Sequence, residues 1–394
     1  MRKIWLLVPV FALLCWWATT PSGEAAPTPT PPGWLKGNTH THTLWSDGDE
    51  PPELVTAWYR DHGYNFLVLS DHNVIANSEE WVPVSRVKEK KVKQLQSTFG
   101  TDAVSLRKDG QEMRLVTLSE LRQRFEKPGQ FLMMTGEEIT DSYNKYPVHV
   151  NGLNLAEIIP PQHGKSVTDV ANRNLRAVVE QGRKLGRPVL GHLNHPHFGW
   201  AFSVQDLAHI EAERFFEVYN GHNQNQGDAT HIPIEDMWDQ ALVIRLEQLH
   251  LPLLNCIASD DAHNYQKYAT GQANPGRGWV MVRCPRLDGD SIIKAMQAGQ
   301  YYSSSGVVLK DFRITARDYS LTIQPHGADT FVTRFIGVRQ GKLEVFHQVS
   351  GLAASYHLKG DELYVRATVT SSRRHPNPAE AGEHERAWLQ PTRP

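Results

Sequence analysis

Short runs of consecutive apolar residues, each followed at once by polar side chains, recur between residues 34 and 305 of this 394-residue chain. Continuous apolarity, in place of alternation, is typical of strands buried on both faces, as in a parallel sheet covered by helices. Between the runs lie helical patterns, at residues 51–62, 167–183 and 234–250. The apolar runs themselves occupy residues 66–69, 131–134, 188–190, 215–216 and 251–257.

Strand followed by helix, repeated many times, predicts an α/β fold in the form of a TIM-like β/α barrel, whose active site is built at the carboxyl ends of the strands. An open doubly wound sheet is the alternative, but its ligands would gather at one switch point. Because nearly every apolar run here ends in polar residues, we expect a closed barrel over residues 34–305. A Lys- and Glu-rich insertion interrupts it at residues 78–130, and its charge run most simply forms a solvated face.

From about residue 306 the pattern changes to alternation of apolar and polar residues, as at 319–323, 342–349 and 362–370. Alternation with short turns, such as Gln340-Gly341, is typical of antiparallel hairpins. We therefore expect a C-terminal antiparallel β domain over residues 306–394, acting as a structural cap or, alternatively, as a carbohydrate-binding module.

The N-terminus reads as an export signal. Arg2 and Lys3 precede an apolar run at 4–18, and small residues flank a cleavage point after Ala25, so residues 1–25 are expected to be a signal peptide. The run of 15 residues is short for a span of about 20, which predicts no stable membrane span after cleavage, with an uncleaved anchor as the alternative. Residues 26–33 form a Pro-rich spacer. The expected location is periplasmic or extracellular.

The stretch around His40-Thr41-His42 introduces the candidate site. Two histidines two residues apart on a strand face the same side, and Asp47, in a Ser-Asp-Gly turn, can fold back beside them. Such a pair alone is more often not a metal site, so the other strand ends must supply the remaining ligands. The full set of candidate ligands is His40, His42, Asp47, His72, Glu138, His149, His195, Asp261 and His263.

Nine imidazoles and carboxylates are too many for one ion and suit two or three. Because the set contains no sulfur, divalent Zn, Mn or Fe is expected. A glutamate such as Glu138 is suited to bridge two ions through its two oxygens. The formal net charge of −2 argues against a nucleic-acid surface, and a small-molecule ester is the expected partner. The oligomeric state is not indicated by the sequence.

These residues resemble the PHP (polymerase and histidinol phosphatase) family of metallohydrolases, which fold as a distorted seven-stranded (β/α)7 barrel. His40-Thr41-His42 with Ser46-Asp47-Gly48 looks like the first motif, Ser70-Asp71-His72-Asn73 the second, and Gly136-Glu137-Glu138-Ile139 the Gly-x-Glu strand end. His149, His195-Pro196 and Asp261-Ala262-His263 complete the set. The resemblance implies one ion held by His40, His42, Glu138 and Asp261, a second by Asp47, His72 and His263, and a third by Glu138, His149 and His195.

The export signal, the β extension and the closing Ala387-Trp388-x-Gln390-Pro391 look more like the CehA/McbA-type branch of that family, which includes carbamate and ester hydrolases as well as phosphoesterase-like members. The main hypothesis is hydrolysis of a phosphoester by a metal-bridging hydroxide, with Glu138 counted among the catalytic residues as the bridging carboxylate. Cleavage of a carbamate or carboxylic ester is the alternative. A non-catalytic metal-binding module is a second alternative, disfavoured by the complete ligand set.

Several further residues have expected roles around the ligands. His222 or His197 would protonate the leaving group, and Asn220 and Arg277 would contact substrate. Behind the ligands, Asp71, Asp260 and Glu217 are expected to orient them. Glu137 should face away from the site because its neighbour Glu138 faces it. His192, one step out of register, is either behind the ligands or part of the packing.

Overall fold

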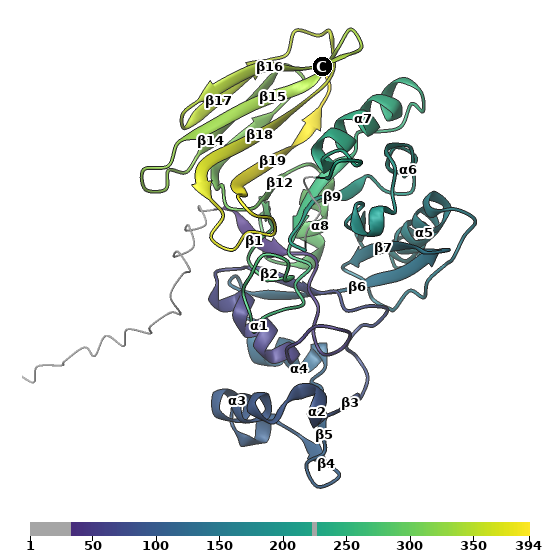
Figure 1. Cartoon of the computed structure of the whole chain (residues 1–394), viewed down its shortest axis with the longest axis vertical. Coiled ribbons are helices and arrows are strands. Elements are labelled where there is room, and N and C mark those ends of the chain that lie inside the picture. Colours follow the sequence, from purple (N-terminus) through teal and green to yellow (C-terminus); the bar gives the residue numbers. More distant parts are fainter. Residues whose placement is uncertain (1–32, 223–226) are drawn as a thin grey trace, which may run out of the picture.

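The computed structural model describes residues 33–222 and 227–394 (Figure 1). The predicted signal peptide, and all but the last residue of the predicted spacer, lie outside the described residues. Within those ranges, no helix is both long enough and apolar enough to cross a membrane.

One large mixed sheet organises the molecule, and six of its strands point in the same direction. Two parallel groups are joined by β7 (Tyr146–Leu153), which is antiparallel to its neighbour on each side. Because β7 reverses the direction twice, the carboxyl ends of all six strands meet at one edge. The six are β1 (Leu35–Asn38), β2 (Phe66–Leu69), β6 (Leu132–Tyr143), β8 (Leu190–Leu193), β9 (Phe215–Asn220) and β10 (Asn255–Ser259).

Helices follow these strands largely where the sequence predicts them. In α5 (Val167–Leu185), the Ser166 hydroxyl accepts the Asp169 N–H at the start, and Gly186 closes the end in the left-handed conformation. Its apolar stripe, which includes Leu175 and Val178, is buried on the sheet. The others are α1 (Pro52–Asp61), α4 (Leu118–Phe125), α6 (Val204–Ala208), α7 (Ile234–Glu247) and α8 (Gly289–Gln297).

The expected closed barrel is not formed by a backbone ladder. The strand order is β10-β9-β8-β7-β6-β2-β1-β11-β12-β19-β18-β15-β16, so in the described part of the chain β10 is a sheet edge. The sheet nevertheless curls until β10 lies against β12 and β19. There the Gln390 side chain accepts the Cys256 N–H at 2.9 Å and donates to the Cys256 carbonyl at 3.1 Å. A side-chain amide thus takes the place of a strand-to-strand pair.

The C-terminal strands are antiparallel, as the alternation predicts, and they continue the main sheet through the pairing of β12 with β19. Gln340-Gly341 makes the turn between β15 and β16. A separate three-stranded sheet contains β13 (Leu309–Ile314), β14 (Asp318–Ile323) and β17 (Ala353–His357). The strands that extend the main sheet are β11 (Trp279–Val282), β12 (Tyr301–Ser304), β15 (Phe331–Arg339), β16 (Lys342–Ser350), β18 (Glu362–Arg374) and β19 (His384–Thr392).

Most of the predicted insertion at residues 78–130 lies at the end of the molecule opposite the C-terminal sheet (Figure 1). Helix α4 (Leu118–Phe125), within the predicted range of 78–130, packs on α1 and β6 and so belongs to the main body. The rest of the insertion is attached to the loop between β1 and α1, where the Trp45 indole donates to the Val116 carbonyl at 3.0 Å. Its elements are β3 (Trp81–Pro83), α2 (Val84–Val87), α3 (Glu89–Phe99), η1 (Thr101–Ala103), β4 (Leu106–Arg107) and β5 (Glu112–Arg114).

The Gln390 bridge predicts a stability effect. In Gln390→Ala, the buried Cys256 N–H loses its acceptor, so the free energy of unfolding should fall by about 1–3 kcal/mol. Urea denaturation followed by circular dichroism measures the change. Gln94→Ala, at an exposed position of α3, is the matched control and should be close to neutral. Equal stability of the two variants would show that the bridge contributes nothing.

Candidate metal centre

The nine side chains predicted as ligands lie together at the carboxyl edge of the parallel strands. They form four overlapping groups, and within each group the ligand atoms lie within 4.8 Å of one another. Compared with the expected sets, His42 also joins the second, Glu138 is absent from the first, and the third is divided between two groups. The groups are His42, Asp47, His72 and His263; His40, His42 and Asp261; His40, Glu138 and His195; and His72, Glu138 and His149.

The Ser-Asp-Gly turn folds back over His42 as the sequence suggests. A Cβ at Gly48 would lie 2.7 Å from the His42 backbone, so only glycine permits this approach. The turn brings the Asp47 carboxylate to 3.7 Å from His42 Nδ1 and to 3.2 Å from His263 Nε2. Asp71 holds the loop in place by accepting the Thr43 N–H at 2.8 Å and the Ser46 hydroxyl at 2.6 Å. Asp71 therefore positions the loop that carries Asp47.

Glu138 is the centre of the cluster. It lies within β6, not at its end, and its neighbour across the β6–β7 hairpin is Asn151. Its carboxylate is buried, and its two oxygens face different histidines. Oε1 lies 3.1–3.3 Å from nitrogens of His40, His149 and His195, and Oε2 lies 2.8–3.3 Å from nitrogens of His42 and His72. This division is the geometry that a carboxylate shared between two ions requires.

Hydrogen bonds at Nδ1 leave the Nε2 atoms of three histidines directed at carboxylates. His40 Nδ1 lies 2.8 Å from Glu217 Oε1, and His263 Nδ1 lies 2.8 Å from the Asp261 carbonyl. Since a carbonyl or carboxylate oxygen only accepts, each Nδ1 carries a proton, and when the ring is neutral its lone pair lies at Nε2. For His42, the same follows from Nδ1 at 3.3 Å from the Ser46 hydroxyl, whose own proton goes to Asp71.

Each of these Nε2 atoms faces carboxylate oxygens at close range. His40 Nε2 is 3.2 Å from Asp261 Oδ1, and His42 Nε2 is 3.1 Å from the same oxygen. In the part of the chain that the structure describes, the Nε2 atoms of His40 and His42 and the Oε2 atom of Glu138 are buried without a hydrogen-bond partner. Facing lone pairs repel one another unless a proton or a metal ion lies between them. The donor set therefore fits divalent metal ions of the borderline or hard class.

The pKa shifts of His40 and Glu138 also indicate that the cluster favours positive charge. Burial lowers the pKa of His40, but Asp261, Glu138 and Glu217 outweigh it and raise that pKa well above its usual range. Burial likewise raises the pKa of Glu138, yet His40 and His149 hold it well below its usual value. The carboxylate is thus ionised, and its neighbours must supply the compensating charge.

Glu217, on β9, contacts the candidate ligand His40. Besides His40, it accepts the His195 N–H at 2.8 Å and the Ser259 hydroxyl at 2.6 Å. Burial raises its pKa, but His40 outweighs this and brings the pKa to about 2. A carboxylate that fixes the tautomer and orientation of a ligand histidine raises the basicity of the ligand.

Two supporting residues were missed by the sequence interpretation. Asn194 donates to Glu138 Oε1 at 2.7 Å, and Ser259 donates to Glu217. Their only local signal is position, because Asn194 directly precedes His195 and Ser259 ends β10 just before the Asp260-Asp261 pair. His195 and Asp261 also have positive φ angles, of 20° and 48°. Such conformations are uncommon for these residues and gather at functional sites.

Arg277 and Asn220, both expected to contact substrate, make hydrogen bonds within the protein. Arg277 is fully buried, and its guanidinium donates to the carbonyls of Gly221, Ala269 and Asn377 at 2.7–3.0 Å. Asn220 is also buried and donates to Glu217 and Asp261 at 2.8 and 3.2 Å. Both side chains therefore act within the protein, Arg277 by joining loops and Asn220 by orienting carboxylates.

Asp260 accepts hydrogen bonds mainly from backbone N–H groups and not from the candidate ligands. It is buried and accepts the Tyr59 hydroxyl at 2.8 Å and the N–H groups of Arg277 and Gly278 at 2.6 and 2.8 Å. Its expected role was to orient a ligand. The contacts instead tie the loop that follows β10 to the start of β11.

The two candidate general acids differ in position. The His222 ring centre lies 6.1 Å from that of His263, which places His222 beside the ligand cluster. The ring of His197 packs on Trp200 at 5.0 Å. Glu137 faces away from the cluster as predicted, accepting the Ile159 N–H at 2.6 Å, and burial raises its pKa to about 7. His192 is buried 4.0 Å from Glu217, and burial lowers its pKa to about 4, so it is a neutral ring behind His40.

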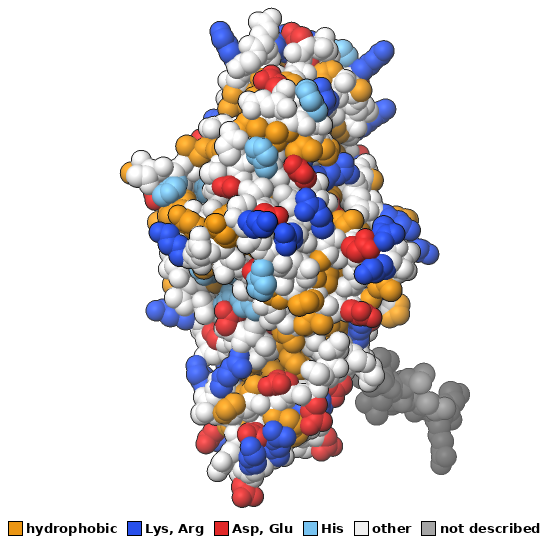
Figure 2. Space-filling model, turned by 90° about the vertical axis from the view of Figure 1, so that its right-hand side faces the viewer, with side chains coloured by type: hydrophobic (Ala, Val, Ile, Leu, Met, Phe, Trp, Pro, Cys, Tyr) orange, Lys and Arg blue, Asp and Glu red, His pale blue; other side chains and the backbone are white. Residues whose placement is uncertain are grey.

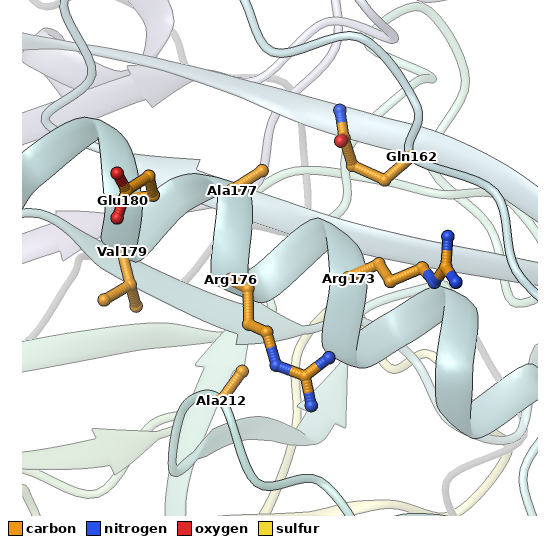
Figure 3. A pocket seen from close by; sticks show the side chains of 7 residues that line it. All are labelled: Gln162, Arg173, Arg176, Ala177, Val179, Glu180 and Ala212. Atoms are coloured by element: carbon orange, nitrogen blue, oxygen red, sulfur yellow. The ribbon is translucent and has the colours of Figure 1, made fainter.

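Away from the cluster, the surface is mixed in character. Figure 2 shows Lys and Arg, Asp and Glu, and apolar side chains interspersed over one face. The hollow drawn in Figure 3 lies on α5 and is lined by Arg173, Arg176, Gln162 and their neighbours. It contains none of the nine candidate ligands, so it is distinct from the metal centre.

Comparison with known proteins finds no family model and no curated protein that matches the chain. Among solved structures, a two-domain protein from Bacteroides vulgatus ATCC 8482, described as containing a predicted PHP-like metal-dependent phosphoesterase, is 14% identical with a TM-score of 0.44, over 94% of this chain and 100% of its own.

Two further solved structures are more distant. A protein from Bifidobacterium adolescentis ATCC 15703, described as a candidate metal-dependent phosphoesterase, is 13% identical with a TM-score of 0.32, over 61% of this chain and 90% of its own. An amidohydrolase from Chromobacterium violaceum is 12% identical with a TM-score of 0.28, over 52% and 82%. TM-scores below 0.5 do not establish a shared fold. The function of this chain is therefore inferred from the geometry of its site.

The position of Glu138 predicts the effect of its removal. Glu138→Gln keeps the size of the side chain but removes the charge that faces five histidines, so the protein should lose at least one bound metal ion per chain. Elemental analysis of the purified protein measures this content. Glu137→Gln, at the neighbouring residue that faces away, is the control and should keep the full content. Unchanged metal content in Glu138→Gln would contradict a bridging role.

Glu217 offers a second prediction about the same site. Glu217→Gln removes the carboxylate that fixes His40 while leaving all nine candidate ligands in place, so metal affinity should fall by about 10–100-fold. Titration against a competing chelator measures the affinity. The exposed Glu211→Gln is the control. If both variants bound metal as tightly as the wild type, Glu217 would have no part in positioning His40.

Proposed function

We propose that this chain is a metal-dependent hydrolase and that phosphoesters are its substrates. The observation that supports the proposal most directly is the set of histidine Nε2 lone pairs that face Asp261 and Glu138 inside the protein. A buried arrangement of this kind is unfavourable without cations. In a purely structural core it would lower the stability of the folded protein. We propose two or three divalent ions of Zn, Mn or Fe as its occupants.

The ions, when bound, would lower the pKa of a bound water and hold the oxygens of the ester. The residues of the chain have separate roles around them. Glu138 would be a ligand to two of the ions, and Glu217 and Asp71 would keep His40 and the Asp47 loop in place. His222 lies beside His263 and is the residue that we propose as proton donor to the leaving oxygen, in preference to His197.

We propose that the chain belongs to the PHP family and to its CehA/McbA-like branch. The order of the motifs along the chain and the clustering of all nine residues support this proposal. We propose with it an exported protein with a signal peptide at 1–25, an α/β metallohydrolase domain at 34–305 and a C-terminal β-rich domain at 306–394. Hydrolysis of a carbamate or carboxylic ester would use the same ligands, so the substrate panel must include both chemistries.

A four-substrate assay tests the function. The metal-loaded protein should hydrolyse p-nitrophenyl phosphate or bis-p-nitrophenyl phosphate, and treatment with a chelator should abolish the activity. Activity confined to p-nitrophenyl acetate and 1-naphthyl methylcarbamate would replace the phosphoesterase proposal by the carbamate or ester alternative. A metal-loaded protein inactive on all four substrates would favour a non-catalytic metal-binding module. Glu138→Gln serves as the inactive control in each case.

A further inference from the structure

A phenylalanine ring stands exposed at the edge of the metal centre. The centre of the Phe198 ring lies 5.1 Å from that of His195, 6.1 Å from that of His149 and 5.8 Å from that of His222. Phe198 therefore contacts two candidate ligands and the proposed proton donor. Although it touches three rings, 38% of its surface remains exposed. An aromatic ring left open to water beside a polar cluster offers an apolar contact area to a ligand.

The Phe198 ring is presented by a tight and well-supported turn. The Phe198 N–H donates to the His195 carbonyl at 2.8 Å, so the ring follows directly from the backbone of a candidate ligand. Gly199 has a φ of 61°, and a Cβ there would lie 3.1 Å from Pro147, two residues before His149. The turn thus rests on the strand that carries another candidate ligand. A ring held in this way is already ordered before any ligand arrives, which lowers the entropic cost of contact.

The position of His222 indicates which part of a substrate would meet this ring. The charged oxygens of an ester must lie among the ligand side chains, and a proton donor must lie beside the leaving oxygen. Because Phe198 is in edge contact with His222, it borders the space on the leaving-group side. The Phe198 ring has neither a charge nor a hydrogen-bond donor with which to bind anionic oxygens. We therefore expect an apolar group of the substrate to contact it.

We propose that Phe198 forms a subsite for an aromatic leaving group, whose ring packs against that of Phe198. The inference rests on the proposed function, because it takes the ligand cluster as the place where the ester is held. It makes Phe198 a specificity-determining residue, which selects aryl over small alkyl esters without contributing a ligand or a proton. The simpler reading is that Phe198 only covers the histidines, and the choice of variants separates the two.

Binding of two matched phosphonates tests the subsite without any turnover. Benzylphosphonate and ethylphosphonate carry the same anionic head and differ in the aromatic ring, and calorimetry on the Mn²⁺-loaded protein gives both affinities. The wild type should bind benzylphosphonate about tenfold more tightly, a difference of about 1.4 kcal/mol. Phe198→Ala should bring the ratio close to one at unchanged metal content. Phe198→Trp should preserve the ratio because it restores an aromatic face.

Two further variants distinguish an aromatic subsite from a residue that only covers the histidines. Phe198→Leu keeps an apolar cover over the histidines and should still lose most of the preference. Leu343→Ala, at a residue 48% exposed on β16, is the control and should keep the ratio of the wild type. A ratio unchanged in Phe198→Ala, or a wild type that binds both phosphonates equally, overturns the subsite alone. If neither phosphonate binds, the proposed function fails and the subsite falls with it.

Discussion

The arrangement on which the rest of the structure depends is the close approach of buried histidine lone pairs to carboxylate oxygens. Nε2 of His40 and Nε2 of His42 both point at Asp261 from little more than 3 Å, while their Nδ1 atoms are already engaged elsewhere. Only a positive charge makes such an arrangement favourable. The surrounding protein therefore has to hold like-charged and lone-pair-bearing atoms together, and the fixed hydrogen bonds of Glu217 and Asp71 do so.

The β6–β7 hairpin is the part of the fold that adapts a parallel sheet to this task. Because β7 runs antiparallel, His149 returns beside β6 and pairs with Thr140, two residues from Glu138. A parallel strand after a helix would have brought only its carboxyl end to the site. The reversal lets one hairpin supply two candidate ligands, and it places Asn151 where it supports Asn194 behind Glu138.

The C-terminal strands belong to the same construction. Gln390 completes the edge of β10, and two ion pairs tie α7 to the C-terminal strands. The buried Arg366 lies 2.6 Å from Asp239, and the partly exposed Arg386 lies 2.7 Å from Glu235. β10 is the strand that leads into Asp261 and His263. The C-terminal strands therefore help to fix the position of two candidate ligands.

The sequence by itself determined the buried strands β2, β6, β8, β9 and β10, the helices α1, α5 and α7, and the identity of the nine clustered side chains. Each of these depends on a local pattern that a few neighbouring residues carry. The tertiary structure decided the curl of the sheet without a closing ladder, the burial of Arg277 and the contacts of Asn194, Ser259 and Phe198. These features join residues far apart in the chain. Whether a polar side chain meets a carbonyl, a ligand or open solvent depends on what the fold brings opposite it, and no local pattern records that.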